Sequence, residues 1–137
     1  QCLGVAQGNG AGVVDQHVDA AEAMVAYLNE RKRSNPKSPH WQIRVGAHSG
    51  SVVSGVIGGS RLAFDVWGDT VNVAARMESS SEAGRINIST ATKNLLERKT
   101  TQSRGRLAAK NKGDLTMFFV SPNQATLEPE ESTRERS

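Results

Sequence analysis

The sequence predicts a mixed domain in which helices pack against one sheet, of the α/β or α+β class. Apolar residues recur at steps of four and three over residues 14–28, as in an amphipathic helix. From Gln42 the apolar period changes to two, as in a strand. A strand, a glycine and a further helical pattern then follow one another over residues 64–78. The 137 residues are enough for one domain with a single core.

Composition narrows the class of protein. The formal net charge of +3 suits an anionic ligand without demanding nucleic acid, and we expect no nucleic-acid partner. The single cysteine, Cys2, excludes an internal disulfide framework and indicates a reducing compartment. No apolar run reaches membrane-spanning length, so we expect a cytoplasmic chain, attached to a membrane only through regions outside it. Because the chain starts without Met, we expect it to be part of a longer protein.

The N-terminal segments are predicted as a strand end, a turn and a helix. Residues 1–5 read as the end of a strand, and the alternate glycines of residues 7–12 match neither the dinucleotide fingerprint nor the P-loop, which favours a turn. For the helix over residues 14–28, Asp15 is an acceptable cap, and basic residues 31–33 lie near its end. His17, in the first turn, is interpreted as a surface or packing residue. A loop follows over residues 34–39.

A β-hairpin is predicted next. Residues 43–48 and 52–57 are the expected strands, Gly50 and Ser51 the turn, and residues 58–61 a linker to the following strand. His48 lies beside the turn, where a histidine is usually structural.

The central stretch runs from Phe64 to Glu78 and is predicted as strand, turn and helix. Gly68 ends the strand, Asp69 can cap the helix, and Val71 and Ala75 form its apolar side. Asn72 and Arg76 are also four apart and project from one face. An amide beside a permanent cation is suited to binding a phosphate or an oxyanion.

The remaining residues complete the predicted sheet. We expect a short strand over 85–89, a helix over 90–97 capped by Ser89 or Thr90, and a last strand over 115–120. Residues 98–112 are basic with little periodicity. The polar residues 121–137 are expected to form a disordered tail.

The central stretch closely resembles the class III nucleotidyl cyclases, the family of adenylyl and guanylyl cyclases. The family pattern is an aromatic or apolar residue, Asp or Cys, an apolar residue, Trp or Phe, then Gly-Asp/Asn-Thr-Val-Asn, with Arg four residues after the Asn. Every position is filled between Phe64 and Arg76. Further matches are residues 44–50, 55–58 and 110–115, although Asn111 stands where the family usually has glycine.

The resemblance implies a ferredoxin-like βαββαβ cyclase homology domain, of the α+β class, over residues 1–120. The chain would hold the later two-thirds of that domain, truncated at its N-terminal end. Family members work as dimers with active sites at the interface. We therefore expect a second cyclase domain as partner, in a homodimer, because Asp65, Asn72 and Arg76 are all kept in one chain.

The resemblance also implies a reaction and roles. The ribose 3′-hydroxyl of a nucleoside triphosphate attacks its own α-phosphate and expels pyrophosphate. Arg76 would stabilise charge on the α-phosphate, Asn72 would orient the ribose, and Lys110 would hold the terminal phosphates. Asp65, with Val66 beside it in the substrate site, would accept from the adenine amino group. Guanylyl cyclases tend to carry Cys at the position of Asp65, so Asp indicates ATP.

Each role has an alternative that the residues alone leave open. Arg76 could be a solvated helix arginine that pairs with the neighbourhood of Glu78 or with the tail. Asp65 could simply end a strand. Lys110 could be an ordinary solvated loop lysine.

Two divalent ions, Mg²⁺ or Mn²⁺, are implied by the family, but we assign no metal ligand in this chain. Asp65 and Asp69 are separated by the strand-to-helix turn, and the other acidic residues of note lie in the tail. The two aspartates that bind metal in the family would lie upstream of Gln1. We therefore expect this chain alone to be inactive.

Three functions are compatible with the sequence. The first is the catalytic domain of an adenylate cyclase, making cyclic AMP from ATP for intracellular signalling. The second is a guanylate cyclase, or a silent cyclase domain that activates a partner. The third is a non-catalytic RNA-binding module, which would need stacking aromatic residues that strands 42–57 lack after Trp41.

Overall fold

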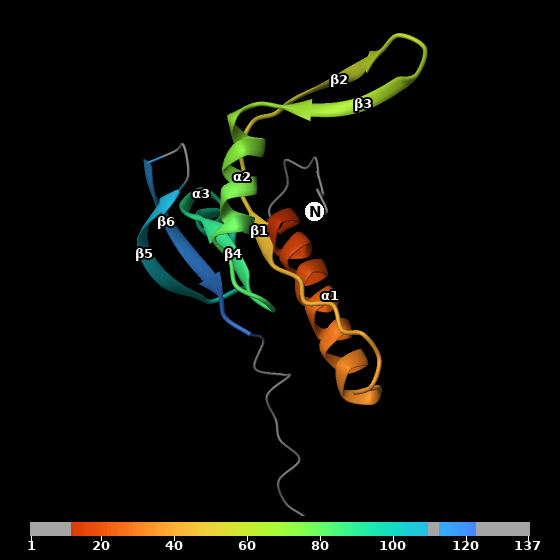
Figure 1. Ribbon diagram of the computed structural model, residues 1–137. Coiled ribbons are helices and arrows are strands. Elements are labelled where there is room, and N and C mark those ends of the chain that lie inside the picture. Colours follow the sequence, from red (N-terminus) through yellow and green to blue (C-terminus); the bar gives the residue numbers. More distant parts are fainter. Residues whose placement is uncertain (1–11, 110–112, 123–137) are drawn as a thin grey trace, which may run out of the picture.

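The computed structural model describes residues 12–109 and 113–122. Helices are interspersed with strands along the chain, in the order α1-β1-β2-β3-α2-β4-α3-β5-β6 (Figure 1). The helices are α1 (Val13–Ser34), α2 (Asp69–Ser79) and α3 (Thr90–Leu95), and the strands are β1 (Val45–Ala47), β2 (Val53–Gly58), β3 (Leu62–Trp67), β4 (Ile86–Ser89), β5 (Thr101–Ala109) and β6 (Gly113–Val120). In the part of the chain that the structure describes, no helix combines the length and the apolar character needed to cross a membrane.

The main sheet has four strands in the order β1-β4-β6-β5. β1 and β4 are parallel, and α2 lies in the connection between them, as a parallel pair requires. β6 is antiparallel to both of its neighbours. This is an α+β arrangement of a sheet with packed helices, which confirms the predicted fold class.

The two faces of the sheet are covered by different helices. Because side chains alternate along a strand, Ile86 and Ile88 join Val18 and Ala21 of α1 in one core cluster. On the other face Met117 packs with the α2 residues, in a cluster formed by Val73, Met77 and Met117. The apolar side of α2 was therefore predicted two residues too early: Val73 and Met77 are buried, while Val71 and Ala75 are half-buried.

Helix α1 is longer than predicted, and its cap differs. It begins at Val13 after Gly12, whose φ of 85° is left-handed, and no side chain caps it. Asp15 is not a cap but a buried residue inside the first turn, whose carboxylate accepts the backbone N–H groups of Glu97 (3.0 Å) and Arg98 (2.9 Å). His17 is exposed, as predicted.

The predicted hairpin between residues 43–48 and 52–57 was wrong. β1 pairs with β4, and β2 pairs instead with β3, with Gly58↔Leu62 as the last paired residues. The stretch interpreted as a linker therefore contains the hairpin turn. The reason is long-range: Gly46 lies against α2 and Ile88 of β4 pairs with Ala47, contacts that a local period of two does not reveal.

The C-terminal part was predicted well except for β5. β4, α3 and β6 occupy the expected segments, and the Ser89 hydroxyl caps α3 by accepting from Thr92 N–H at 3.3 Å. β5 lies in the basic stretch for which no strand was predicted. A bulge between Ser103 and Gly105 interrupts its pairing with β6, which disturbs its alternation. The predictions for residues 1–5, Cys2, Lys110 and nearly all of the tail fall outside the described residues.

Candidate active site

The central stretch forms the predicted strand, turn and helix. β3 ends at Trp67, Gly68 adopts a φ of 126°, and α2 begins at Asp69. Asp69 is thus the first helical residue and Gly68 the N-cap, so the prediction that Asp69 caps the helix was wrong. A left-handed φ favours glycine, which is why the chain can turn sharply here.

Asn72 and Arg76 lie one turn apart on α2. Asn72 is exposed, and Arg76 is half-buried. Val73 and Met77, each one residue further along, point into the core and fix the rotation of the helix. The site pair therefore lies beside the buried stripe, on a helix that packing orients.

The guanidinium of Arg76 has an unusual environment. Its Nε atom is buried and has no hydrogen-bond partner among residues 12–109 and 113–122. Among the described residues, no carboxylate lies within ion-pair distance of Arg76; Glu78 instead pairs with Arg44 at 3.1 Å. A buried, unpaired donor costs about 1–3 kcal/mol, so this cation is well suited to an anion that the protein itself does not supply. The alternative of an ion pair near Glu78 does not apply to the described residues.

Asp65 lies apart from the helix pair, on β3. Its residue is exposed, and its Oδ1 accepts the N–H of Val66 at 2.8 Å. Val66 itself is buried, with 8% exposed. Asp65 pairs with Gly55 across the hairpin, and the ring of Trp67 lies beside that glycine. The structure thus brings Asn72 and Arg76 together on one helix and puts Asp65 and Val66 on the preceding strand. Lys110 lies outside the described residues.

The described residues do not fit a divalent metal. They contain no group of three or more His, Cys, Asp or Glu side chains that could hold an ion. The ligands expected for Mg²⁺ or Mn²⁺ therefore remain a prediction for residues upstream of Gln1.

Several residues that shape the site were missed or given no role. Gly46 lets β1 lie against α2, and Gly50, Ser51 and Thr70 make close contacts between α2 and the segment after β1. The signal was the pair of glycines four residues apart just before the hairpin. Asn87 of β4, fully buried, donates to the Met77 carbonyl at 2.9 Å and fixes the other end of the helix.

A second polar cluster lies at the end of β1. His48 Nδ1 is 2.7 Å from Ser89 Oγ, and Ser49 Oγ is 3.1 Å from Thr92 Oγ1. Burial lowers the pKa of His48, which keeps its imidazole neutral at pH 7. These contacts support the structural interpretation of His48.

Carboxylates of α1 hold the segment that leads into β5. Burial alone would raise the pKa of Asp15, but the two backbone N–H donors and the nearby Arg98 charge lower it below its usual value. Lys99 donates to Asp19 and Glu22, both at 2.6 Å. The hydrogen bond from Lys99 lowers the pKa of Asp19. Burial alone would lower the pKa of Lys99, but the bonds and charges of the two carboxylates raise it above its ordinary value.

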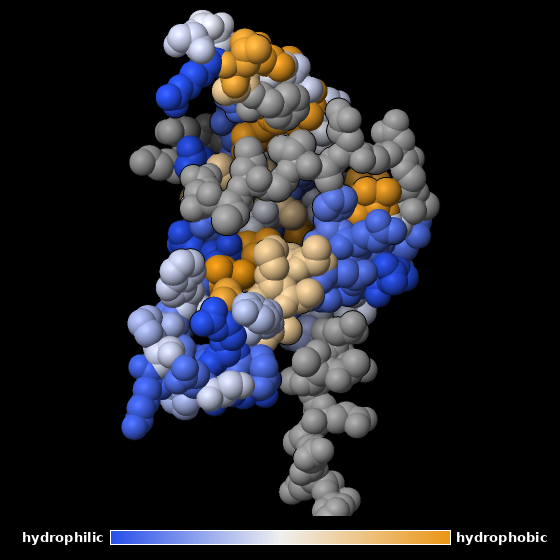
Figure 2. Space-filling model, turned by 90° about the vertical axis from the view of Figure 1, so that its right-hand side faces the viewer, coloured by the Kyte–Doolittle hydropathy of each residue, from blue (hydrophilic) through white to orange (hydrophobic). Residues whose placement is uncertain are grey.

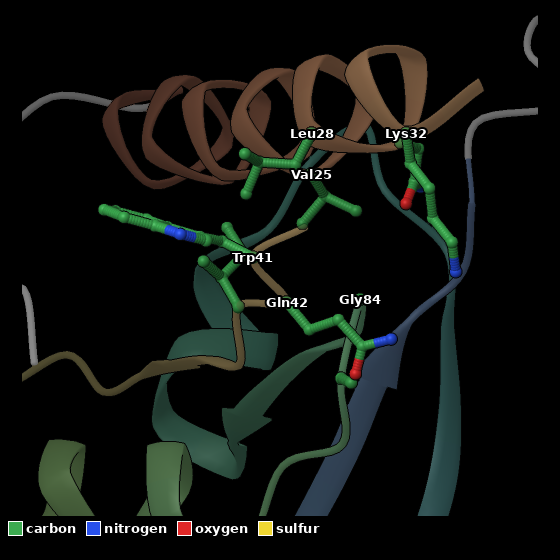
Figure 3. A pocket seen from close by; sticks show the side chains of 9 residues that line it. Val25, Leu28, Lys32, Trp41, Gln42 and Gly84 are labelled. Carbon is green, nitrogen blue, oxygen red and sulfur yellow. The ribbon is translucent and has the colours of Figure 1, made fainter. Parts of the chain in front are cut away.

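A shallow groove lies elsewhere, under the C-terminal half of α1. Val25 and Leu28 of the helix face the loop that carries Trp41 and Gln42 (Figure 3). Of the predicted site residues that the structure describes, none lines this groove, so it is separate from the α2 site.

The family model of the adenylate and guanylate cyclase catalytic domain matches residues 3–122. This chain belongs to that family. Among curated relatives, a germination-specific adenylate cyclase of Dictyostelium discoideum is 63% identical over 49 residues, 35% of this chain and 6% of that protein. An adenylate cyclase of Mycobacterium tuberculosis is 35% identical over 98 residues, 71% of this chain and 22% of that protein. The chain thus spans a small part of these relatives.

Solved cyclase domains have the same fold. The guanylate cyclase domain from Catenaria anguillulae in complex with GTP is 32% identical, with a TM-score of 0.73 over 80% of this chain and 60% of that chain. A domain from Blastocladiella emersonii, called a non-canonical dimeric guanylyl cyclase domain, is 29% identical, with a TM-score of 0.67 over 80% of this chain and 58% of that chain. Relatives of this cyclase domain therefore carry both adenylate and guanylate names.

Proposed function

We propose that this cyclase domain is part of an adenylate cyclase that converts ATP to 3′,5′-cyclic AMP and pyrophosphate. The observation that carries the proposal is Arg76: a half-buried cation with an unpaired Nε, beside Asn72 on a helix of the family's motif. A half-buried guanidinium with an unpaired donor is suited to stabilising a phosphoryl group whose negative charge grows during the reaction.

In the proposed reaction the 3′-oxygen forms a bond to the α-phosphorus, and the bond from that phosphorus to the oxygen bridging the α- and β-phosphates breaks. The proton of the 3′-hydroxyl passes to water as the new bond forms, and pyrophosphate leaves with the electrons of the broken bond. Arg76 donates to the α-phosphate oxygens, and Asn72 orients the ribose. Lys110 holds the terminal phosphates.

ATP is proposed over GTP because of Asp65. Its carboxylate accepts hydrogen bonds, as an adenine amino group requires, and would repel the guanine carbonyl. The adenylate cyclase names of the two curated relatives support this choice. The complex of the Catenaria domain with GTP favours a guanylate cyclase as the second candidate.

The proposed partner is a second copy of the domain. Support comes from the β2–β3 hairpin, which projects from the main sheet in Figure 1 and exposes large apolar side chains at its surface in Figure 2. The domain from Blastocladiella that is described as dimeric supports the same proposal.

The test is made on the full-length protein, incubated with ATP and with GTP in the presence of Mn²⁺, with products identified by mass spectrometry. We expect cyclic AMP from ATP as the main product. Arg76→Ala should lower kcat by about 10²- to 10³-fold, as for removal of one charge-stabilising donor. The matched control is Arg33→Ala, an exposed arginine of α1 paired with Glu30, which should leave kcat unchanged.

Three other results would contradict parts of the proposal. Cyclic GMP as the main product would overturn the choice of ATP. Wild-type activity in Arg76→Ala would overturn the role of that residue. A folded protein that yields neither cyclic nucleotide would leave the silent partner domain as the better account.

A further inference from the structure

The two ends of α2 are held in different ways. At the C-terminal end, Met77 is fully buried, and a Cβ atom at Gly46 would lie 1.9 Å from the backbone nitrogen of Glu78. β1 therefore lies directly against the helix backbone, and no side chain larger than hydrogen fits between them. This end is seated in the core.

The N-terminal end is held by a side-chain contact. Thr70 Oγ1 donates to the carbonyl of Ser51 at 2.6 Å. A Cβ atom at Gly50 would lie 2.6 Å from the same Oγ1 and 3.2 Å from Thr70 Cγ2, so Thr70 occupies the space that the missing side chain of Gly50 leaves. Thr70 thus fits against Gly50 in shape and is hydrogen-bonded to the carbonyl of the next residue, Ser51.

The segment that receives Thr70 is itself fixed to the main sheet. His48 contacts Ser89, the N-cap residue of α3, and Ser49 contacts Thr92 in the first turn of the same helix. Thr70 therefore connects the first turn of α2 to the main sheet. The first turn directly follows β3 and the projecting hairpin in the chain (Figure 1).

We propose that Thr70 is a positioning residue, whose contacts with Ser51 and Gly50 hold the first turn of α2 so that Asn72 and Arg76 meet the nucleotide correctly. This inference rests on the proposed cyclase function. Asn72 follows Thr70 by two residues, so a shift of the first turn moves its amide directly. A displacement of a catalytic side chain by about 1 Å can lower the reaction rate by about 10²-fold. A contact that fixes the position of Asn72 and Arg76 is therefore expected to affect kcat.

The main test compares Thr70→Val with Thr70→Ser in the full-length protein. Val keeps the shape and removes the donor, so kcat for cyclic nucleotide formation should fall about 10-fold, with KM changing less than about threefold. Ser restores the donor and should return kcat to within about twofold to threefold of wild type. The matched control is Ser79→Ala, which removes a hydroxyl bonded to Arg76 O within the same helix and should leave kcat unchanged.

A double-mutant cycle tests the fit with Gly50. Gly50→Ala places a methyl group against Thr70 and should lower kcat. Thr70→Ala removes the obstructing atoms, so Gly50→Ala with Thr70→Ala should be no worse than Thr70→Ala alone. Simple addition of the two effects would overturn the proposed contact.

Amide hydrogen exchange gives a readout besides activity. Thr70→Val should raise exchange about 5- to 10-fold over residues 71–75 and leave residues 77–79 unchanged, because only the N-terminal end loses its anchor. If wild type makes no cyclic nucleotide, the proposed function fails, and a rise confined to residues 71–75 still supports Thr70 as the anchor. If wild type is active and Thr70→Val changes neither kcat nor exchange, the positioning role is overturned and the proposed function stands.

Discussion

Two antiparallel hairpins in the described part of the chain have opposite surroundings. β5 and β6 lie in the main sheet, where Met117 is fully buried and Phe119 is 7% exposed. β2 and β3 form a separate two-stranded sheet, in which Ile57 is 51% and Leu62 is 79% exposed. Helix α2 covers the β5–β6 hairpin, whereas the β2–β3 hairpin projects away from the main sheet (Figure 1).

The difference shows that backbone pairing alone does not account for the stability of a hairpin. A two-stranded hairpin is marginally stable by itself in water, and β2–β3 exposes several large apolar side chains, although Val66 is buried (Figure 2). Exposed apolar patches of this kind mark interaction surfaces. We therefore interpret β5–β6 as part of the core and β2–β3 as an arm that completes its burial against a second copy of the domain, as proposed above.

The largest expected effect lies in the core hairpin. Met117→Ala removes a fully buried side chain between α2 and the sheet and should lower the free energy of unfolding by about 2–5 kcal/mol. Val53→Ala in the arm, where Val53 is 66% exposed, should change it by less than about 0.5 kcal/mol. Urea unfolding at low protein concentration measures both, and equal losses would abolish the distinction between the hairpins.

The next effect is on association. Leu62→Asp places a charge on the arm and should weaken the proposed homodimer at least about 30-fold without lowering the free energy of unfolding of the monomer. Leu95→Asp, an equally drastic change at an exposed leucine of α3, serves as the control and should leave association unchanged. Sedimentation velocity over a concentration series measures this. A dimer of wild-type strength in Leu62→Asp would show that the arm is not the interface.

A smaller effect concerns the anchoring of β5 by Asp15. Because its pKa is lowered in the folded protein, its stabilising contribution is fully present above its ordinary value of 3.8 and is lost as the pH falls through the lowered value. Asp15→Asn should therefore lower Tm by several degrees at pH 7, and the difference from wild type should shrink as the pH falls through the lowered pKa of Asp15. Asp114→Asn, at an exposed carboxylate of β6, is the control. A Tm difference that is independent of pH would contradict the role of the Asp15 charge.

Local patterns in the sequence determined much of the fold. Apolar spacing and turn residues predicted helix α1, the strand and glycine before α2, and the strands β4 and β6. β5 was missed because its bulge breaks the alternation, and the hairpin was assigned to the wrong strands. Pairing joins residues far apart in sequence, such as Val45 and Ile86, and local periodicity carries no information about such partners.

For the site, the sequence by itself determined that Asn72 and Arg76 share one face of a helix, because a spacing of four places two residues one turn apart. It also determined the family, through a motif whose positions are all filled. Only the tertiary structure decided that Arg76 has a buried Nε without a partner, that Glu78 is taken by Arg44, and that Thr70 lies against Gly50. These facts depend on the close approach of segments about 20 to 35 residues apart, which long-range packing sets and the spacing of residues does not.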